Sequence, residues 1–255
     1  MTRIIMHGAC GRMGRVISDI VKEDADAEIV AGVDIAGRDD AGYPVFTDIN
    51  ACDVEADVII DFTTASAVDG LLDYAVKKNL PVVLCSTGLS TEQLDKVRET
   101  SAKIAILKSA NMSLGVNTIL GLLKSATKVF VPAGFDVEIV EQHHHNKLDA
   151  PSGTAIALAD AINEAADGQF EYIYNRSDRR AARDKKELGI SAVRAGSIPG
   201  THDVIFAGQD EVIEIRHIAY SRSIFGVGAV SAAKFLAGKK PGMYDMQDVI
   251  AAQQS

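Results

Sequence analysis

Short apolar runs alternate with longer amphipathic stretches through roughly the first 110 residues. The apolar runs are 3–7, 28–34, 57–62, 81–86 and 103–108. The stretches 67–78 and 91–100 between them have helical spacing, and Ser90 with Gln93 forms the pattern of a capping box before the second. Strands that alternate with helices need crossover connections, so this part of the chain predicts a doubly wound parallel sheet.

Beyond residue 111 the pattern changes to longer strands with few helices between them. After a helical stretch at 116–128, strands are predicted at 136–143, 190–194, 203–207 and 211–219, with a helix that starts after Thr154. Gln209-Asp210 indicates a hairpin turn. The charged segment 176–187 mixes both signs and predicts a solvated helix or loop. The chain returns to helices at 224–236 and 245–251.

These patterns predict two domains in a chain of 255 residues. Residues 1–113 and 225–255 are expected to form an α/β dinucleotide-binding domain, with a Rossmann-like parallel sheet. Residues 114–224 are expected to form a second, α+β domain on a mixed open sheet, for binding substrate and for oligomerisation.

Composition and charge narrow the class of protein. Hydrophobic residues make up 47% and charged residues 24% of the chain, which is typical of an ordinary globular protein. The net charge of −9 opposes binding to nucleic acid and to anionic membranes, so an anionic ligand needs a local basic site. The three cysteines form no C-x-x-C pair, and no apolar run is long enough for a signal peptide or a membrane span. We expect a cytoplasmic protein.

The segment G-A-C-G-R-M-G, from Gly8 to Gly14, lies where a strand leads into a helix. Backbone amides at such a turn can approach a pyrophosphate, because glycines leave room for it. Asp34 closes the second strand about 20 residues later, where an acid can accept hydrogen bonds from a ribose. The turn contributes the candidate cofactor-binding residues Gly8, Ala9, Cys10, Gly11, Arg12 and Met13.

Other candidates for cofactor binding follow later strands, although each also suits a helix cap or a turn. They are Cys85, Ser86, Thr87, Ser109, Ala110, Asn111 and Met112. The Asp34 carboxylate repels a 2′-phosphate and favours NADH, whereas Arg38 could reach that phosphate and leaves NADPH open.

The densest cluster of chemical groups is E-Q-H-H-H-N-K-L-D-A-P-S-G-T-A, from Glu141 to Ala155. On an extended strand His143 and His145 would share one face and His144 the other, so a three-histidine metal site is disfavoured and no metal is expected. Lys147 and the helix opening that follows combine a mobile charge with free amides. Such a site suits a carboxylate.

Three segments together resemble the 4-hydroxy-tetrahydrodipicolinate reductase family, also called dihydrodipicolinate reductase. They are the Glu141 to Ala155 cluster, which matches E-x-H-H-x-x-K-x-D-x-P-S-G-T, the glycine turn, and the closing G-K-K-P-G-M-Y-D-M-Q-D-V-I. The resemblance implies a cytoplasmic, tetrameric, NAD(P)H-dependent reductase of the diaminopimelate route to lysine, acting on a cyclic dicarboxylate imine. Some relatives carry a Glu-Arg pair where Asp34-Ile35 stands here, which argues against strong use of NADPH.

The resemblance also implies roles for individual residues. His143 becomes the proton donor to a substrate that receives hydride at C4, and Lys147 assists. The implied substrate-binding residues are His144, Lys147, Ser152, Gly153 and Thr154. Two other functions stay open: a non-catalytic dinucleotide sensor, which has no need of this cluster, and a metal-assisted hydrolase built on His143 to His145.

Overall fold

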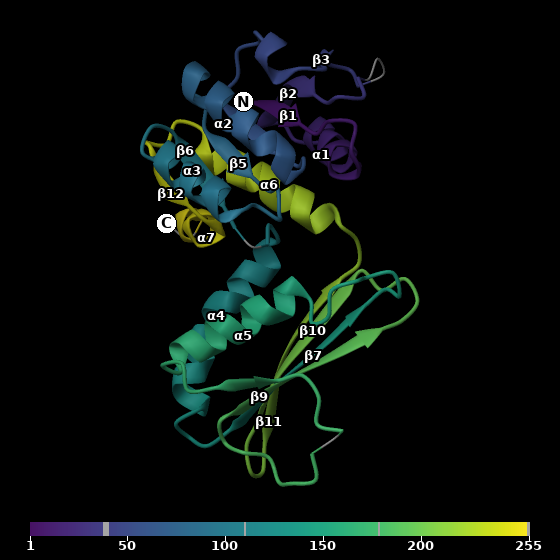
Figure 1. The fold of residues 1–255 in the computed structure, drawn as a ribbon, viewed down its shortest axis with the longest axis vertical. Helices are drawn as coiled ribbons and strands as arrows, with labels where there is room; N and C mark the ends of the chain where they lie inside the picture. The colour runs from purple at the N-terminus through teal and green to yellow at the C-terminus, as the bar shows by residue number, and fades with distance from the viewer. Residues whose placement is uncertain (38–40, 110, 178, 254–255) are drawn as a thin grey trace. The chain divides into compact units, whose positions relative to one another are not determined.

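A computed structural model describes residues 1–37, 41–109, 111–177 and 179–253 of the chain (Figure 1). The chain divides into two units, each with its own core. The first unit comprises residues 1–114 and 223–255, and the second comprises residues 115–222. The first unit is therefore built from both ends of the chain.

The first unit is organised around a seven-stranded sheet with the strand order β12-β6-β5-β4-β1-β2-β3, in which every pairing is parallel. The strands are β1 (Thr2–His7), β2 (Ala27–Val33), β3 (Val45–Phe46), β4 (Val58–Asp61), β5 (Val82–Leu84), β6 (Ala105–Lys108) and β12 (Gly242–Tyr244). The central strands read as continuous apolar runs because helices cover both of their faces. The predicted Rossmann-like parallel sheet is confirmed.

Two separate apolar clusters cover the two faces of this sheet. Successive residues of a strand point to opposite faces, so Ile4 and Met6 of β1 pack in one cluster and Ile5 packs in the other. The helices of the first unit are α1 (Arg12–Lys22), α2 (Ala65–Lys78), α3 (Thr91–Ser101), α6 (Ser223–Leu236) and α7 (Met246–Gln253). Helices α1, α6 and α7 pack on the first face, and α2 and α3 on the second.

Local sequence signals set several helix ends in the first unit. The capping box predicted for Ser90 and Gln93 is present at the start of α3, with both reciprocal hydrogen bonds made. Helix α2 ends at Asn79, whose φ of 53° is the left-handed conformation that asparagine tolerates at a helix end. The capping box lies in the connection that leaves β5 at the carboxyl edge of the sheet, whereas Asn79 lies in the connection that enters β5 at the opposite edge.

The second unit contains a five-stranded mixed sheet with the order β11-β10-β7-β9-β8. Its strands are β7 (Asp136–His143), β8 (Glu171–Ile173), β9 (Glu187–Arg194), β10 (Gly200–Ala207) and β11 (Val212–Ala219). Strand β10 runs antiparallel to β7 and β11, whereas β9 runs parallel to β7 and β8. The predicted hairpin is present, closed by a hydrogen bond from Gly208 N to Glu211 O. This confirms a mixed open sheet.

Helices α4 (Leu114–Phe130) and α5 (Gly153–Ala165) cover one face of this sheet (Figure 1). Val137 and Ile139 of β7 and Val204 and Phe206 of β10 point toward these helices and form the core. The alternate residues point the other way, and that outer face carries three exposed apolar side chains, Val193, Val212 and Ile218. One face of the sheet is thus packed, and the other is exposed.

The charged segment 176–187 is a loop that leads into β9, and most of its described residues are exposed, as predicted. Ion pairs also hold it against the sheet. Arg176 and Arg179 pair with the buried Glu187, and Arg183 pairs with carboxylates at the start of β7. The arginines of this segment thus pair with carboxylates at the starts of β7 and β9.

Candidate active site

The glycine turn lies at the carboxyl end of β1, and its geometry requires glycine. Gly8 has a φ of +89°, and a Cβ there would lie 2.7 Å from Phe62 O. A Cβ on Gly14 would lie 2.3 Å from Gly8 O, so the helix can start this close to the turn only with glycine at that position. The N-cap of α1 is Gly11, and no side chain caps this helix. The first turn of α1 therefore carries no side-chain acceptor of its own.

The Asp34 carboxylate lies beside this turn. Its Oδ2 accepts a hydrogen bond from Cys10 N at 2.9 Å, and its Oδ1 accepts one from Ala36 N at 3.0 Å. The carboxylate is thereby held at the carboxyl end of β2, next to the glycine turn that is predicted to bind the pyrophosphate. Its predicted contact with a ribose stays a prediction, and Arg38, the other residue that bears on cofactor choice, lies outside the described residues.

A buried polar cluster lies at the ends of β1, β4 and β5, and sequence reasoning found only part of it. The fully buried Asp61 accepts hydrogen bonds from Thr63 Oγ1 at 2.7 Å and from Ser86 Oγ at 2.5 Å. His7 Nδ1 lies 2.8 Å from Asp61 Oδ1, the oxygen that also accepts from Thr63. His7 and Asp61 are each the polar last residue of an otherwise apolar strand, and this pattern could have marked them as members of the cluster. The cluster fixes Ser86, one of the predicted cofactor contacts.

The remaining cofactor candidates follow β5 and β6. Cys85 and Thr87 flank Ser86, and burial, reinforced by the Asp61 carboxylate, raises the pKa of the Cys85 thiol well above its usual value. Ser109, Asn111 and Met112 follow β6, whereas Ala110 lies outside the described residues. The parallel sheet brings the carboxyl ends of β1, β2, β4, β5 and β6 to the edge where doubly wound sheets bind ligands.

In the second unit, the buried Glu141 organises the predicted histidine and lysine cluster. Its Oε2 lies 2.6 Å from His143 Nδ1, and its Oε1 accepts a hydrogen bond from Ser152 N at 3.0 Å. Arg194 at the end of β9 donates to both oxygens, at 2.9 and 2.8 Å. Ser152 also caps α5 by accepting from Ala155 N. The helix opening and the imidazole therefore share one carboxylate.

This environment moves the pKa values of both partners. Burial opposes ionisation of Glu141, but the hydrogen bonds from Arg194, His143 and Ser152 outweigh it and lower the pKa of that carboxyl. Burial lowers the pKa of His143 as well, against the opposing effect of Glu141. The carboxylate is thus ionised, and the imidazole loses its proton more easily than a free histidine.

The loop after β7 differs from one expectation. The strand ends at His143 and the chain turns at His145, so these two histidines do not share a strand face as predicted. His144 is half-buried at the start of the loop and His145 is exposed. Lys147 Nζ lies 2.8 Å from Asp149 Oδ1, an ion pair that lowers the pKa of Asp149. The lysine stays in the loop that leads into α5.

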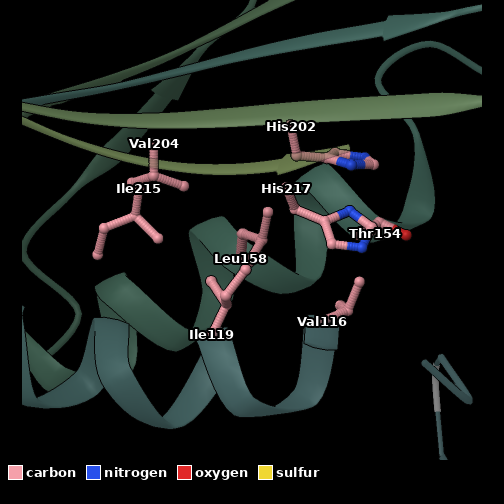
Figure 2. Close-up of a pocket in the computed structure, with 8 residues that line it drawn as sticks. All are labelled: Val116, Ile119, Thr154, Leu158, His202, Val204, Ile215 and His217. Carbon is pink, nitrogen blue, oxygen red and sulfur yellow. The ribbon is translucent and has the colours of Figure 1, made fainter. Parts of the chain in front are cut away.

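Two further histidines, which sequence reasoning missed, line a narrow pocket beside this cluster (Figure 2). His202 of β10 and His217 of β11 lie with ring centroids 6.1 Å apart, next to Thr154. His202 Nε2 lies 3.0 Å from Ser152 Oγ. Burial and the neighbouring histidines lower the pKa of His202 to about 4, so this ring is neutral at neutral pH.

Within residues 1–37, 41–109, 111–177 and 179–253, no group of three or more His, Cys, Asp or Glu is arranged to hold a metal ion. Across those same residues, no helix has the length and apolar character needed to span a membrane.

Two family models together match most of the chain. The model described as dihydrodipicolinate reductase, N-terminus, matches residues 2–112, and the model described as dihydrodipicolinate reductase, C-terminus, matches residues 115–250. Curated relatives agree. The 4-hydroxy-tetrahydrodipicolinate reductase of Caldanaerobacter subterraneus subsp. tengcongensis is 50% identical over 250 residues, which cover 98% of each chain. That of Clostridium tetani is 49% identical over 246 residues, or 96% of each chain.

Solved structures agree with the family models. A dipicolinate-bound dihydrodipicolinate reductase from Paenisporosarcina sp. TG-14 matches with a TM-score of 0.81 and 25% identity, over 98% of this chain and 99% of that one. A probable dehydrogenase from Thermotoga maritima shares the fold, with a TM-score of 0.63 and 14% identity over 98% and 93% of the two chains. The chain therefore belongs to the dihydrodipicolinate reductase family and is an oxidoreductase.

Proposed function

We propose that the protein reduces 4-hydroxy-tetrahydrodipicolinate to tetrahydrodipicolinate in the diaminopimelate route to lysine. The observation that carries this proposal is the Glu141-centred cluster, in which a histidine, a lysine and a helix N-terminus gather in one part of the second unit. A dicarboxylate suits such a site, because amides at a helix start and a lysine both stabilise anions. The relatives named for this reaction support the choice of substrate.

The reaction consumes one hydride and one proton, and the 4-hydroxyl group of the substrate leaves as water. A nicotinamide cofactor supplies the hydride when it is bound. After water is lost, hydride addition at C4 leaves an electron-rich enamine on the substrate. We assign the proton that completes the reduction to His143, assisted by Lys147. Because an anionic ligand favours a protonated imidazole, the substrate itself offsets the lowered pKa of His143.

Two sets of residues would hold the reactants. The substrate carboxylates would be bound by His144, Lys147, Ser152, Gly153 and Thr154. The uncapped turn before α1, with Asp34 held beside it, fits a dinucleotide. Residues of the first unit proposed to hold it are Gly8, Ala9, Cys10, Gly11, Arg12, Met13, Asp34, Cys85, Ser86, Thr87, Ser109, Asn111 and Met112. Steady-state oxidation of NADH or NADPH with freshly generated substrate tests the function, and no turnover with either cofactor would refute it.

We further propose that NADH is preferred over NADPH. The fixed Asp34 carboxylate repels a 2′-phosphate at the tip of β2. Asp34→Asn has nearly the same shape and removes the charge, and its amide oxygen can keep the hydrogen bond from Cys10 N while the one from Ala36 N is lost. We expect the ratio of kcat/KM for NADH to that for NADPH to fall about tenfold, or about 1.4 kcal/mol. The control is Asp26→Asn, the same substitution at an exposed residue just before β2 begins. A wild-type preference for NADPH, or an unchanged ratio in the variant, would contradict this assignment.

The outer face of the second sheet supports the proposal of a homotetramer. Val193, Val212 and Ile218 are 43%, 58% and 44% exposed on a face that neither α4 nor α5 covers. A second copy of the chain would bury them. We expect Ile218→Asp to lower the sedimenting mass, and Val129→Asp, at an exposed position of α4, to leave it unchanged. A monomeric wild-type chain would overturn the proposal. A cytoplasmic location stays a prediction.

A further inference from the structure

Glu141 accepts hydrogen bonds on both oxygens from groups that can only donate. Arg194 contributes two N–H groups and Ser152 contributes its backbone amide. An ionised carboxylate only accepts hydrogen bonds, so the remaining contact, at 2.6 Å, must be donated by His143 Nδ1. In the neutral ring, Nδ1 therefore carries the hydrogen and Nε2 carries the lone pair.

The surroundings of His143 leave Nε2 as the nitrogen for proton exchange. A Cβ on Gly200 would lie 3.0 Å from Nε2, so glycine at that position keeps space beside this atom. The ring of His202 meets the His143 ring edge-on, with centroids 5.2 Å apart, and its lowered pKa keeps it neutral. Nδ1 is occupied by Glu141, which leaves Nε2 as the only ring nitrogen that can take up and release a proton.

Arg194 extends this arrangement to the loop before α5. Its guanidinium pairs with both oxygens of Glu141 and also donates to Asp149 O at 2.6 Å. The charged and titratable groups that act on His143 are Glu141 on β7, Arg194 on β9, His202 on β10 and Lys147 in the loop. Arg194 neutralises Glu141, so the carboxylate orients the imidazole without adding a net negative charge beside it.

We propose that Glu141 and Arg194 are a positioning pair for the proton donor: they fix the His143 tautomer that exchanges its proton through Nε2, and they tie that ring to the 144–152 loop and the start of α5. The inference rests on the proposed function for its catalytic meaning. The tautomer itself is a property of the free protein. It arises from residues 53 positions apart in the chain.

The direct test is nitrogen-15 NMR of the histidine side chains in the wild-type protein, with the His143 signals assigned by their loss in His143→Gln. Above the pKa of His143, we expect the shifts of a protonated Nδ1 and an unprotonated Nε2. The opposite tautomer, or an even mixture, would overturn the inference. This measurement needs no turnover and no variant of Glu141.

Glu141→Gln tests the consequence for catalysis. The glutamine amide can take two orientations. If its NH2 replaces Oε1, it faces two fixed donors, Ser152 N and Arg194; if it replaces Oε2, it faces one fixed donor, Arg194, and the imidazole of His143. The second orientation is favoured, and because the NH2 then donates to His143 Nδ1, we expect the His143 tautomer to reverse. Loss of the negative charge leaves Arg194 and Lys147 near the ring and lowers the pKa of His143 further. We expect kcat to fall on the order of 10²-fold, and the loss of activity with rising pH to begin at lower pH.

Glu138→Gln is the matched control, because Glu138 lies on the same strand, pairs with Arg183 and points to the other face. It should change neither the tautomer nor the pH profile. If Glu141→Gln retains the wild-type tautomer and pH profile, the positioning role is refuted while the proposed function stands. If His143→Ala turns over normally, the proposed proton donor is refuted while the tautomer result stands.

Discussion

Replacing His143 with alanine is expected to lower kcat on the order of 10²- to 10⁴-fold, the usual contribution of a general acid. The reason is that the ring is the proposed source of the proton that completes the reduction, and its Nδ1 is already held by Glu141. Cofactor affinity should not change, because the proposed dinucleotide site lies in the first unit. Stopped-flow oxidation of NADH with fresh substrate measures the first effect, and calorimetric titration with NADH measures the second.

The chain provides a control for this change two residues away. His145 is exposed in the turn after β7 and has no assigned role, so His145→Ala should keep wild-type turnover. Equal losses in both variants would point to a disturbed loop instead of a missing proton donor. Normal turnover in His143→Ala would remove this residue from the mechanism.

Gly14→Ala is expected to reduce kcat/KM for NADH on the order of 10²-fold, equal to about 2.7 kcal/mol. The new Cβ would lie 2.3 Å from Gly8 O and 2.7 Å from Ala9 O, and these backbone atoms belong to the glycine turn proposed to bind the dinucleotide. The turn or the start of α1 must therefore move away from its present path. Such overpacking also lowers the free energy of unfolding, by about 1–3 kcal/mol.

Gly70→Ala separates this effect from a general response to losing glycine. Gly70 is an exposed residue within α2, and a Cβ there would meet no atom within 4 Å. We expect it to raise the free energy of unfolding by about 0.5–1 kcal/mol and to leave NADH binding unchanged. Urea denaturation, steady-state kinetics with varied NADH and calorimetric titration with NADH give the comparison for both variants. Wild-type NADH affinity in Gly14→Ala would contradict the assignment of the turn.

Much of the fold could be predicted because its signals are local. Apolar runs, the Ser90 and Gln93 capping box and the Gln209-Asp210 turn each lie within a few residues, and the structure contains all of them. Strands β3, β8 and β12 were missed, since each has only two or three residues and, unlike β5, none lies within a longer apolar run. They form only because a neighbouring strand pairs with them.

The candidate site shows the same division between local and distant partners. The segment from Glu141 to Thr154 is continuous, so its histidine, lysine and helix start could be recognised together. Its partners from other strands could not, because Arg194 lies on β9 and His202 on β10, far away in the sequence. Likewise, His7 and Asp61 meet across neighbouring strands, 54 positions apart. Only the pairing of the strands reveals such contacts.

A crystal structure of the protein with NADH and dipicolinate is the most direct test of the proposed chemistry. We predict that one carboxylate of dipicolinate binds the amides at the start of α5, that Lys147 and the His143 ring contact the ligand, and that the nicotinamide ring lies against it. Dipicolinate bound without contact to His143 or Lys147, or out of reach of the nicotinamide, would contradict the assignment of this cluster as the catalytic site.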